Sequence, residues 1–295
     1  MEVGTCGAVR GVQLERQASS LWPAHPFRTL QGAATFPLMC AKGVVAALVT
    51  ALCAAAPAAA QERAPDRFVS LHAQAPSIVI EMRYLTAHNF IGRPIRGYRD
   101  PLCIVTRETA RALRRAQARV RRRGYTLKVY DCYRPQRAVD DFVAWGKRLR
   151  DQRMKAEFYP RVDKRRVFEE GYIAEQSGHS RGSTIDITLV RRPPGPQDRY
   201  RRGDRLEDCA APRSRRFRDN SIDMGTGYDC FDPLSHPFNA RVKGVQRRNR
   251  LLLRRAMLAQ GFKGLATEWW HFTLREEPYP ETFFDFPVSR AALAG

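Results

Sequence analysis

The sequence lacks the features that mark several large protein classes. It has no apolar run of the roughly 20 residues that a membrane-spanning helix needs, and no internal repeat or heptad pattern, which disfavours repeat proteins and coiled coils. No two cysteines are spaced as in a CxxC motif, which argues against a structural zinc knuckle. Acidic side chains are in the minority, with 30 Asp and Glu against 51 Lys and Arg.

The formal net charge of +21 raises the question of nucleic acid. The basic residues are spread along the whole chain, however, and aromatic-rich RNA motifs and recognition-helix signatures are absent. We therefore expect a basic, solvated surface, no nucleic-acid partner, and at most a loose association with anionic cell-envelope polymers.

The chain divides into a leader and one domain. Residues 39–60 have the basic start, the apolar middle and the small-residue end of a secretory signal peptide. We interpret residues 1–38 as an over-extended start, which leaves residues 61–295 as a single catalytic domain that is exported, to the periplasm. A membrane anchor is disfavoured because the run is short and rich in Ala, and a lipoprotein cysteine at Cys53 is disfavoured because Leu52 precedes it.

Four cysteines remain after the leader is removed. An even number in an exported chain indicates disulfides, with three possible connectivities. Of these we predict Cys103 with Cys132, which would tie the loop before a helix to the strand after it. The other pair, Cys209 with Cys230, would pin a long exposed loop at residues 191–220, rich in Pro, Arg and Asp.

Periodicity predicts an α+β domain with a central antiparallel or mixed sheet flanked by helices. Thr106 is a candidate helix cap and Gly124 a candidate helix end, while Pro135 opens a second helix that reaches Leu149. The strand after Gly124 alternates as a half-buried strand does. The predicted helices cover residues 106–124, 135–149 and 251–260, and the predicted strands cover residues 125–133, 184–190 and 267–274.

Two short sequence motifs contain candidate metal ligands. His179 lies in the polar, turn-prone sequence SGHSRGSTID (177–186), and Asp186 interrupts an apolar strand, where an unpaired carboxylate is costly. The second phrase, EWWH (268–271), adds His271 and the carboxylate of Glu268. Two imidazoles and one carboxylate are a ligand set for catalytic zinc, with Glu268 left to accept a proton from water. Since Glu268 and His271 are three residues apart, they need a bend near Trp269 to face the same site.

Residues 61–295 resemble the D-alanyl-D-alanine dipeptidases of glycopeptide resistance and their periplasmic relatives, zinc peptidases related to D,D-carboxypeptidases and hedgehog domains. Five ordered motifs carry the resemblance: Tyr84 with residues 89–98 (NFIGRPIRGY), 131–139 (DCYRPQRAV), 177–189, 223–236 (which begins DMGTGYD) and 268–287.

The resemblance implies a hedgehog/D,D-peptidase-like fold and one zinc ion bound by His179, Asp186 and His271. It implies that Glu268 is the general base and later the acid, and that Arg134 holds the scissile carbonyl oxygen. It also implies a small dipeptide substrate, its carboxylate near Ser177 and Tyr98, its ammonium near Asp229 and Tyr84. His72, His88 and His236 are interpreted as structural or surface residues, with His236 the one that could line the site.

Two alternatives stay open. A D,D-carboxypeptidase or endopeptidase would keep the same zinc site but leave an open groove for a longer peptide, whereas Asp229, if it pairs a free ammonium, favours a closed dipeptide pocket. A non-catalytic, zinc-bearing cell-wall-binding module is disfavoured because both Glu268 and Arg134 are present.

Overall fold

The structure is a computed structural model that describes residues 62–293; the predicted leader lies outside the described residues. The described chain forms a five-stranded sheet in the order β2-β4-β5-β7-β6 and a two-stranded sheet of β1 and β3. The strands are β1 (Phe68–Ser70), β2 (Val79–Ile80), β3 (Ile104–Thr106), β4 (Tyr125–Asp131), β5 (Thr184–Arg191), β6 (Phe262–Gly264) and β7 (His271–Leu274). The helices are α1 (Leu71–Gln74), α2 (Arg107–Arg121), α3 (Gln136–Lys147), α4 (Lys155–Phe158), α5 (Gly244–Leu258) and α6 (Arg290–Leu293).

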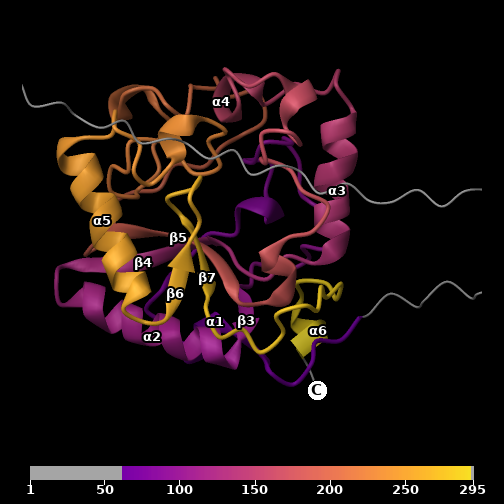
Figure 1. Cartoon of the computed structure of the whole chain (residues 1–295), viewed down its shortest axis with the longest axis vertical. Helices are drawn as coiled ribbons and strands as arrows, with labels where there is room; N and C mark the ends of the chain where they lie inside the picture. Colours follow the sequence, from indigo (N-terminus) through magenta and orange to yellow (C-terminus); the bar gives the residue numbers. More distant parts are fainter. Residues whose placement is uncertain (1–61, 294–295) are drawn as a thin grey trace, which may run out of the picture. The chain divides into compact units, whose positions relative to one another are not determined.

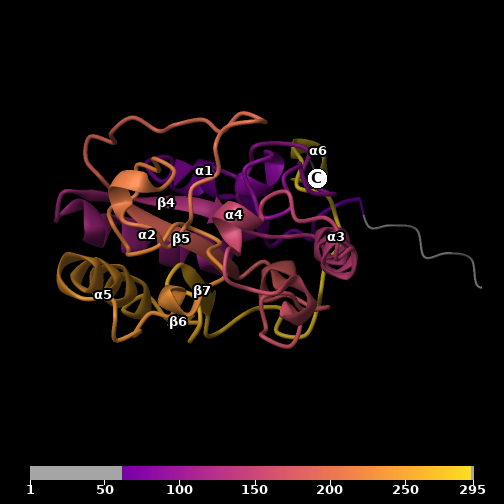
Figure 2. The same ribbon diagram turned by 90° about the horizontal axis from the view of Figure 1, so that it is seen from above.

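The larger sheet is mixed, because β2 runs parallel to β4 while the other neighbours are antiparallel. Helices α2 and α5 pack against each other and against β4 and β6, and α3 lies on the opposite side of the molecule from α5 in both views (Figures 1 and 2). The predicted α+β class with a mixed sheet and flanking helices is confirmed. No helix within residues 62–293 is long and apolar enough to cross a membrane.

Helix α2 shows why its sequence forms that element. The side chain of Thr106 accepts a hydrogen bond from the backbone N–H of Thr109 at 3.4 Å, which satisfies one of the free donors at the helix start. Its apolar residues recur at helical spacing and are buried, while its arginines lie on the exposed side. The chain leaves the helix through Gly124, whose φ of +77° suits glycine.

Strand β4 is more deeply buried than the sequence predicted. The alternation over residues 125–133 predicted a half-buried strand, but β4 is buried on both faces and ends at Asp131. The ammonium of Lys128 is fully buried and lies 2.8 Å from Glu81 Oε2 and 2.6 Å from Asp219 Oδ1. A buried cation is tolerated when it is paired in this way, so the polar residue does not mark a solvated face.

Other boundaries differ from the predicted ones. Helix α5 begins seven residues before the predicted start, at Gly244, and α3 ends at Lys147, which leaves Leu149 exposed outside it. Strand β7 begins only at His271, after bends at residues 269 and 270. Strand β5 agrees with its prediction to within one residue.

Both predicted disulfides are present, Cys103 with Cys132 and Cys209 with Cys230. The second pins the 191–220 loop, as predicted. This loop is exposed along much of its length, but Tyr200 stacks on His88, and its end delivers Asp219 to the buried cation of Lys128.

Candidate metal centre and its cavity

The fold brings His179, Asp186 and His271 together. His179 lies in a 3₁₀ turn, η3 (Gly178–Arg181), directly before β5, which carries Asp186, and His271 is the first residue of β7. Asp186 and His271 are directly opposed in the β5–β7 pairing, so their side chains share one face of the sheet. The bend before β7 is the irregularity that Glu268 and His271 were expected to need.

The three ligand atoms form a nearly equilateral triangle. His179 Nε2 lies 3.3 Å from Asp186 Oδ1 and 3.3 Å from His271 Nδ1, and His271 Nδ1 lies 3.2 Å from Asp186 Oδ1. Two ligands of a tetrahedral zinc ion with bonds of about 2.0–2.1 Å lie about 3.3–3.4 Å apart. The buried Asp186 Oδ1 accepts no hydrogen bond from any described residue. Both observations fit a metal ion at the centre of this group.

Neighbouring groups orient two of the ligands. His179 Nδ1 lies 2.7 Å from the carbonyl oxygen of Cys132, which assigns the proton to Nδ1 and leaves Nε2 free to bind metal. The hydroxyl of Tyr228 donates to Asp186 Oδ2 at 2.9 Å. Although burial alone would raise it, the two imidazoles hold the pKa of Asp186 well below its usual range. Asp186 is therefore a carboxylate with one oxygen held and the other free.

Glu268 lies beside this group without completing it. Its Oε2 is 3.5 Å from His271 Nδ1, and burial raises the pKa of its carboxyl group to about 7, helped by the charge of Asp186. A carboxyl group with a pKa near neutral is suited to accept and return a proton.

Arg134 is held rigidly at the edge of the site. Its Nε donates to Asp131 Oδ2 at 2.9 Å, and its guanidinium lies over the rings of Tyr84 and Phe142 at 5.0 Å. Its Nη2 lies 3.7 Å from Asp186 Oδ2. The guanidinium is therefore a fixed positive charge next to the metal ligands.

A one-residue shift in register on β4 places Asp131 in this arrangement. Val129 pairs with Ile187, but Asp131, and not Tyr130, pairs with Asp186. Simple alternation would put Asp131 on the face opposite Asp186, and a bulge of this kind re-aims a side chain. Asp131, Asp186 and His271 consequently form one row across β4, β5 and β7.

The site opens into a cavity of about 320 Å³. This is at the small end of the range of roughly 300–1,000 Å³ for ligand pockets. Asp229 also lines the cavity, and its Oδ2 accepts a hydrogen bond of 2.8 Å from the hydroxyl of Tyr84. Burial, and then the charge of Asp186, raise the pKa of Asp229 well above its usual range. The cavity is lined by the polar residues Arg134, Ser177, His179, Asp186, Asp229, Glu268 and His271, and by apolar residues that include Phe90, Phe142, Tyr172, Phe231 and Leu265.

The structure brings most of the predicted site residues to this cavity, with one exception. Ser177 lines it and accepts a hydrogen bond from Arg134 at 3.4 Å. Tyr98 is not among the described residues that line the cavity; its hydroxyl donates to Asp131 Oδ1 at 2.6 Å from behind. The structure thus shows Tyr98 as a support for Asp131, and its role at a substrate carboxylate stays a prediction. His236 does not line the cavity either.

Two residues with contacts in the site had no predicted role, Asp131 and Tyr228. Both lie inside the matching motifs, in DCYR (131–134) and GYD (227–229), but nothing in the sequence says which way they face. For Asp131 the answer depends on the register shift in β4, and for Tyr228 on a loop 42 residues after Asp186 in the chain. The available signal was closeness in sequence to a candidate site residue, since Tyr228 directly precedes Asp229 and Asp131 lies three residues before Arg134.

The chain is similar in sequence to known peptidases. The sequence pattern of the family described as D-ala-D-ala dipeptidase matches residues 65–196 and 214–289. Residues 197–213 are left unmatched, within the 191–220 loop.

Individual relatives match over most of their length. A D-alanyl-D-alanine dipeptidase of Streptomyces coelicolor is 40% identical over 209 residues, which covers 71% of this chain and 92% of the relative. The enzyme of the same name from Enterococcus faecalis is 36% identical over 209 residues, with the same shares covered. That of Escherichia coli is 31% identical over 199 residues, 68% of this chain and 80% of the relative.

Proposed function

The chain belongs to the D-ala-D-ala dipeptidase family and is a metallopeptidase, and on this premise we propose that it hydrolyses the dipeptide D-Ala-D-Ala to two D-alanines with one zinc ion. The observation that carries the proposal is the triangle of His179, Asp186 and His271, with Glu268 beside it in a small cavity.

Zinc is the ion that best suits the donor set. Two imidazole nitrogens and one carboxylate oxygen at tetrahedral spacing are typical of catalytic zinc, whereas magnesium and calcium prefer six or more oxygen ligands. When bound, such an ion supplies a Lewis acid and lowers the pKa of a water molecule to about 7.

Glu268 accepts the proton of the attacking water and returns it to the leaving amine. Its carboxyl group is placed within reach of the metal position but makes no part of the ligand triangle. Arg134 supplies a fixed positive charge where the amide oxygen becomes negative. A well-placed donor of this kind contributes about 3–4 kcal/mol to the transition state, and Asp131 keeps the guanidinium from reorienting.

Asp229 and Tyr84 form the end of the cavity that receives the substrate ammonium. An incoming ammonium stabilises the charged form of Asp229, which burial otherwise disfavours. A blocked amino end would leave this carboxyl group buried without that partner, which is costly. The small cavity and the buried Asp229 together favour a free dipeptide over a longer peptide.

The test compares D-Ala-D-Ala with N-acetyl-D-Ala-D-Ala and with a pentapeptide that ends in D-Ala-D-Ala. We expect kcat/KM to be orders of magnitude higher for the free dipeptide than for the other two substrates. Asp229→Ala should reduce this difference, because it should lower kcat/KM for the free dipeptide most. Comparable kcat/KM values for all three substrates in the wild-type enzyme would refute the closed pocket and favour a D,D-carboxypeptidase.

We also propose that the enzyme acts outside the cytoplasm, in the periplasm. Two disulfides support this, since such bonds persist in oxidising compartments. A loose attraction to anionic cell-envelope polymers is supported by α2 and the turn after it, where eight exposed arginines occur within residues 107–123 with Glu108 as the one carboxylate. Sedimentation with purified cell-envelope polymer, repeated at increasing salt, tests the attraction.

A further inference from the structure

The segment from Gly227 to Cys230 is attached at both of its ends to a single residue, Cys209. The backbone N–H of Gly227 donates to the carbonyl oxygen of Cys209 at 2.8 Å, and Cys230 is joined to Cys209 by the disulfide. The two residues between these ends are Tyr228 and Asp229. Tyr228 donates a hydrogen bond to the candidate metal ligand Asp186, and Asp229 lines the cavity.

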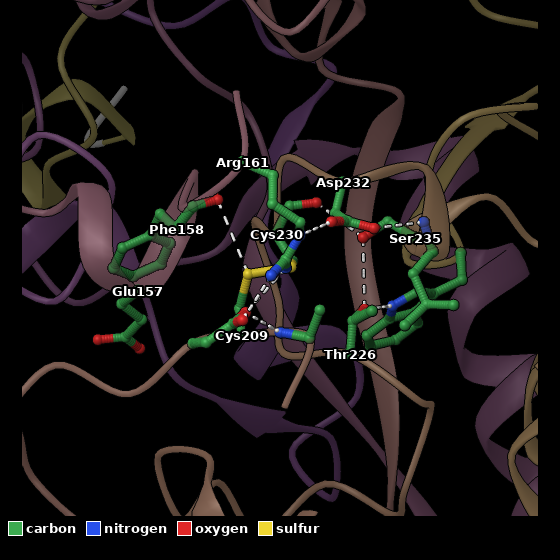
Figure 3. Close-up of a disulfide and its surroundings, with 12 residues drawn as sticks. Glu157, Phe158, Arg161, Cys209, Thr226, Cys230, Asp232 and Ser235 are labelled. Atoms are coloured by element: carbon green, nitrogen blue, oxygen red, sulfur yellow. Dashed lines mark hydrogen bonds and ion pairs between the residues drawn. A yellow bond between two sulfur atoms is a disulfide. The ribbon is translucent and has the colours of Figure 1, made fainter. Parts of the chain in front are cut away.

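Cys209 is in turn fixed to the body of the domain. Its N–H donates to the carbonyl oxygen of Glu157 at 3.0 Å, and the next residue of α4, Phe158, accepts a hydrogen bond from the N–H of Phe231 at 2.8 Å. Figure 3 shows the disulfide between α4 and the segment that carries Asp232 and Ser235. Helix α4 therefore holds the chain on both sides of the disulfide through backbone hydrogen bonds, to Cys209 on one side and to Phe231 on the other.

A second, ionic link joins the same two chain segments. Arg161 pairs with Asp232, two residues after Cys230, at 2.5 Å (Figure 3). It also pairs with Asp208, the neighbour of Cys209, at 2.5 Å. This pair of ion pairs is partly solvated, since half of the Arg161 side chain is exposed, so it is weaker than the covalent link.

The backbone at Asp229 needs such support. Its φ of +55° makes it the one non-glycine residue with positive φ within residues 62–293. A positive φ is uncommon for residues with a side chain, although Asp adopts it more readily than most, so contacts that hold this turn favour it. In this conformation the carboxyl group of Asp229 accepts the hydrogen bond from Tyr84.

Cys209 belongs to residues 197–213, the stretch that the family pattern leaves unmatched. We propose that this unmatched stretch positions the substrate-binding segment through Cys209, and that the Cys209–Cys230 disulfide thereby sets the selectivity for a free ammonium group. The inference rests on the proposed function, because it assigns the ammonium to Asp229. It makes substrate selectivity dependent on the oxidation state of one cysteine pair.

The experiment compares two double variants, Cys209→Ser with Cys230→Ser, and Cys103→Ser with Cys132→Ser. The second is the matched control for the ratio, since it removes a disulfide but leaves the Gly227–Cys230 anchor in place; because the carbonyl oxygen of Cys132 orients His179, it is expected to lower kcat/KM for both substrates together. For each protein the ratio of kcat/KM for D-Ala-D-Ala to that for N-acetyl-D-Ala-D-Ala is measured. General loss of stability or of metal lowers both values and leaves this ratio unchanged.

Loss of the Cys209–Cys230 disulfide should lower the ratio by about ten- to a hundredfold, the size of effect that a misplaced binding group produces. The loss should come through a higher KM for the free dipeptide, and the control should keep the wild-type ratio. A wild-type ratio in the Cys209→Ser, Cys230→Ser protein overturns the inference.

Two further measurements keep the result decisive. If the double variant does not fold, the ratio is measured on the wild-type enzyme after its disulfide has been reduced with dithiothreitol. Each cystine gains two electrons and two protons while dithiothreitol is oxidised. Alkylation of the free thiols and peptide mapping then identify which cysteine pair was reduced. Asp229→Ala in the oxidised enzyme separates the two hypotheses. If it lowers the ratio while disulfide loss does not, only the present inference fails; if it leaves the ratio unchanged, the proposed ammonium site fails and this inference fails with it.

Discussion

Replacing Tyr228 with Phe should weaken zinc binding without touching a zinc ligand. The substitution removes one hydroxyl group, the donor of the 2.9 Å hydrogen bond to Asp186 Oδ2, and leaves the ring in place. The remaining neighbour of that oxygen is Arg134, 3.7 Å away, too far to replace the bond. Asp186 would then be less firmly held in the rotamer that presents Oδ1 to the metal.

The expected size follows from the kind of bond lost. A hydrogen bond to a charged group contributes about 1.5–3 kcal/mol, and about 1.4 kcal/mol corresponds to a tenfold change in Kd. We therefore expect the Kd for zinc to rise by about ten- to a hundredfold, as is typical when a residue that holds a metal ligand is lost.

The assay is competition between metal-free protein and a chromophoric chelator of known zinc affinity. Tyr130→Phe is the matched control: its ring stacks on Tyr228 at 4.4 Å, but its hydroxyl donates to Asp219, away from the metal. A Kd for Tyr228→Phe equal to that of the control and the wild type would show that this hydrogen bond does not orient Asp186, and the reasoning would be wrong.

Three other predictions concern the reaction and the fold. Glu268→Gln should retain zinc, measured by metal analysis, while kcat falls by about 10²–10⁴-fold, because the residue is a base and not a ligand; loss of zinc would mean that the carboxylates are misassigned. The kcat/KM should decline as the pH falls through the pKa of Glu268, because the base must be deprotonated. Burial raises that pKa to about 7 in the metal-free site and a bound cation lowers it, so the acid limb of the pH profile should lie below pH 7; a rate that increases toward acid would contradict this role. Lys128→Met should lower the free energy of unfolding in urea by about 1–3 kcal/mol, since it removes a buried cation that pairs with Asp219 and Glu81, while the buried Arg83 still pairs with both; the exposed Lys263→Met should change it by less than about 0.5 kcal/mol, and equal effects would contradict the explanation.

The parts of the fold that the sequence predicted are those governed by local rules. Helix α2 has a capping Thr106, a helical apolar repeat and a terminal Gly124, each of which acts within a few residues. Strand β5 is short, β-branched and bounded by turn residues. The disulfide pairing could be predicted because the helix and strand order limits which cysteines come close.

The parts that it did not predict depend on partners distant in the chain. Alternation in β4 reports which side chains share a face, but not that both faces are covered, because the partners of Lys128 come from residues 81 and 219. The start of β7 is set by pairing with β5, and the orientation of Asp131 by a register shift. The contact between Tyr98 and Asp131 could not be predicted, because a motif shows that a residue belongs to the site region but not which side chain it contacts.

The row of Asp131, Asp186 and His271 across three strands makes the metal an indicator of correct strand alignment. A slip of one residue between β5 and β7 would turn His271 to the opposite face of the sheet and separate two of the three ligands. A slipped sheet would then lack the metal site altogether, whereas the native pairing gains the whole binding free energy of the ion. Molecules with misaligned strands should therefore remain metal-free when metal is supplied. The molar ratio of bound metal to protein should then equal the fraction of molecules whose central strands are correctly paired.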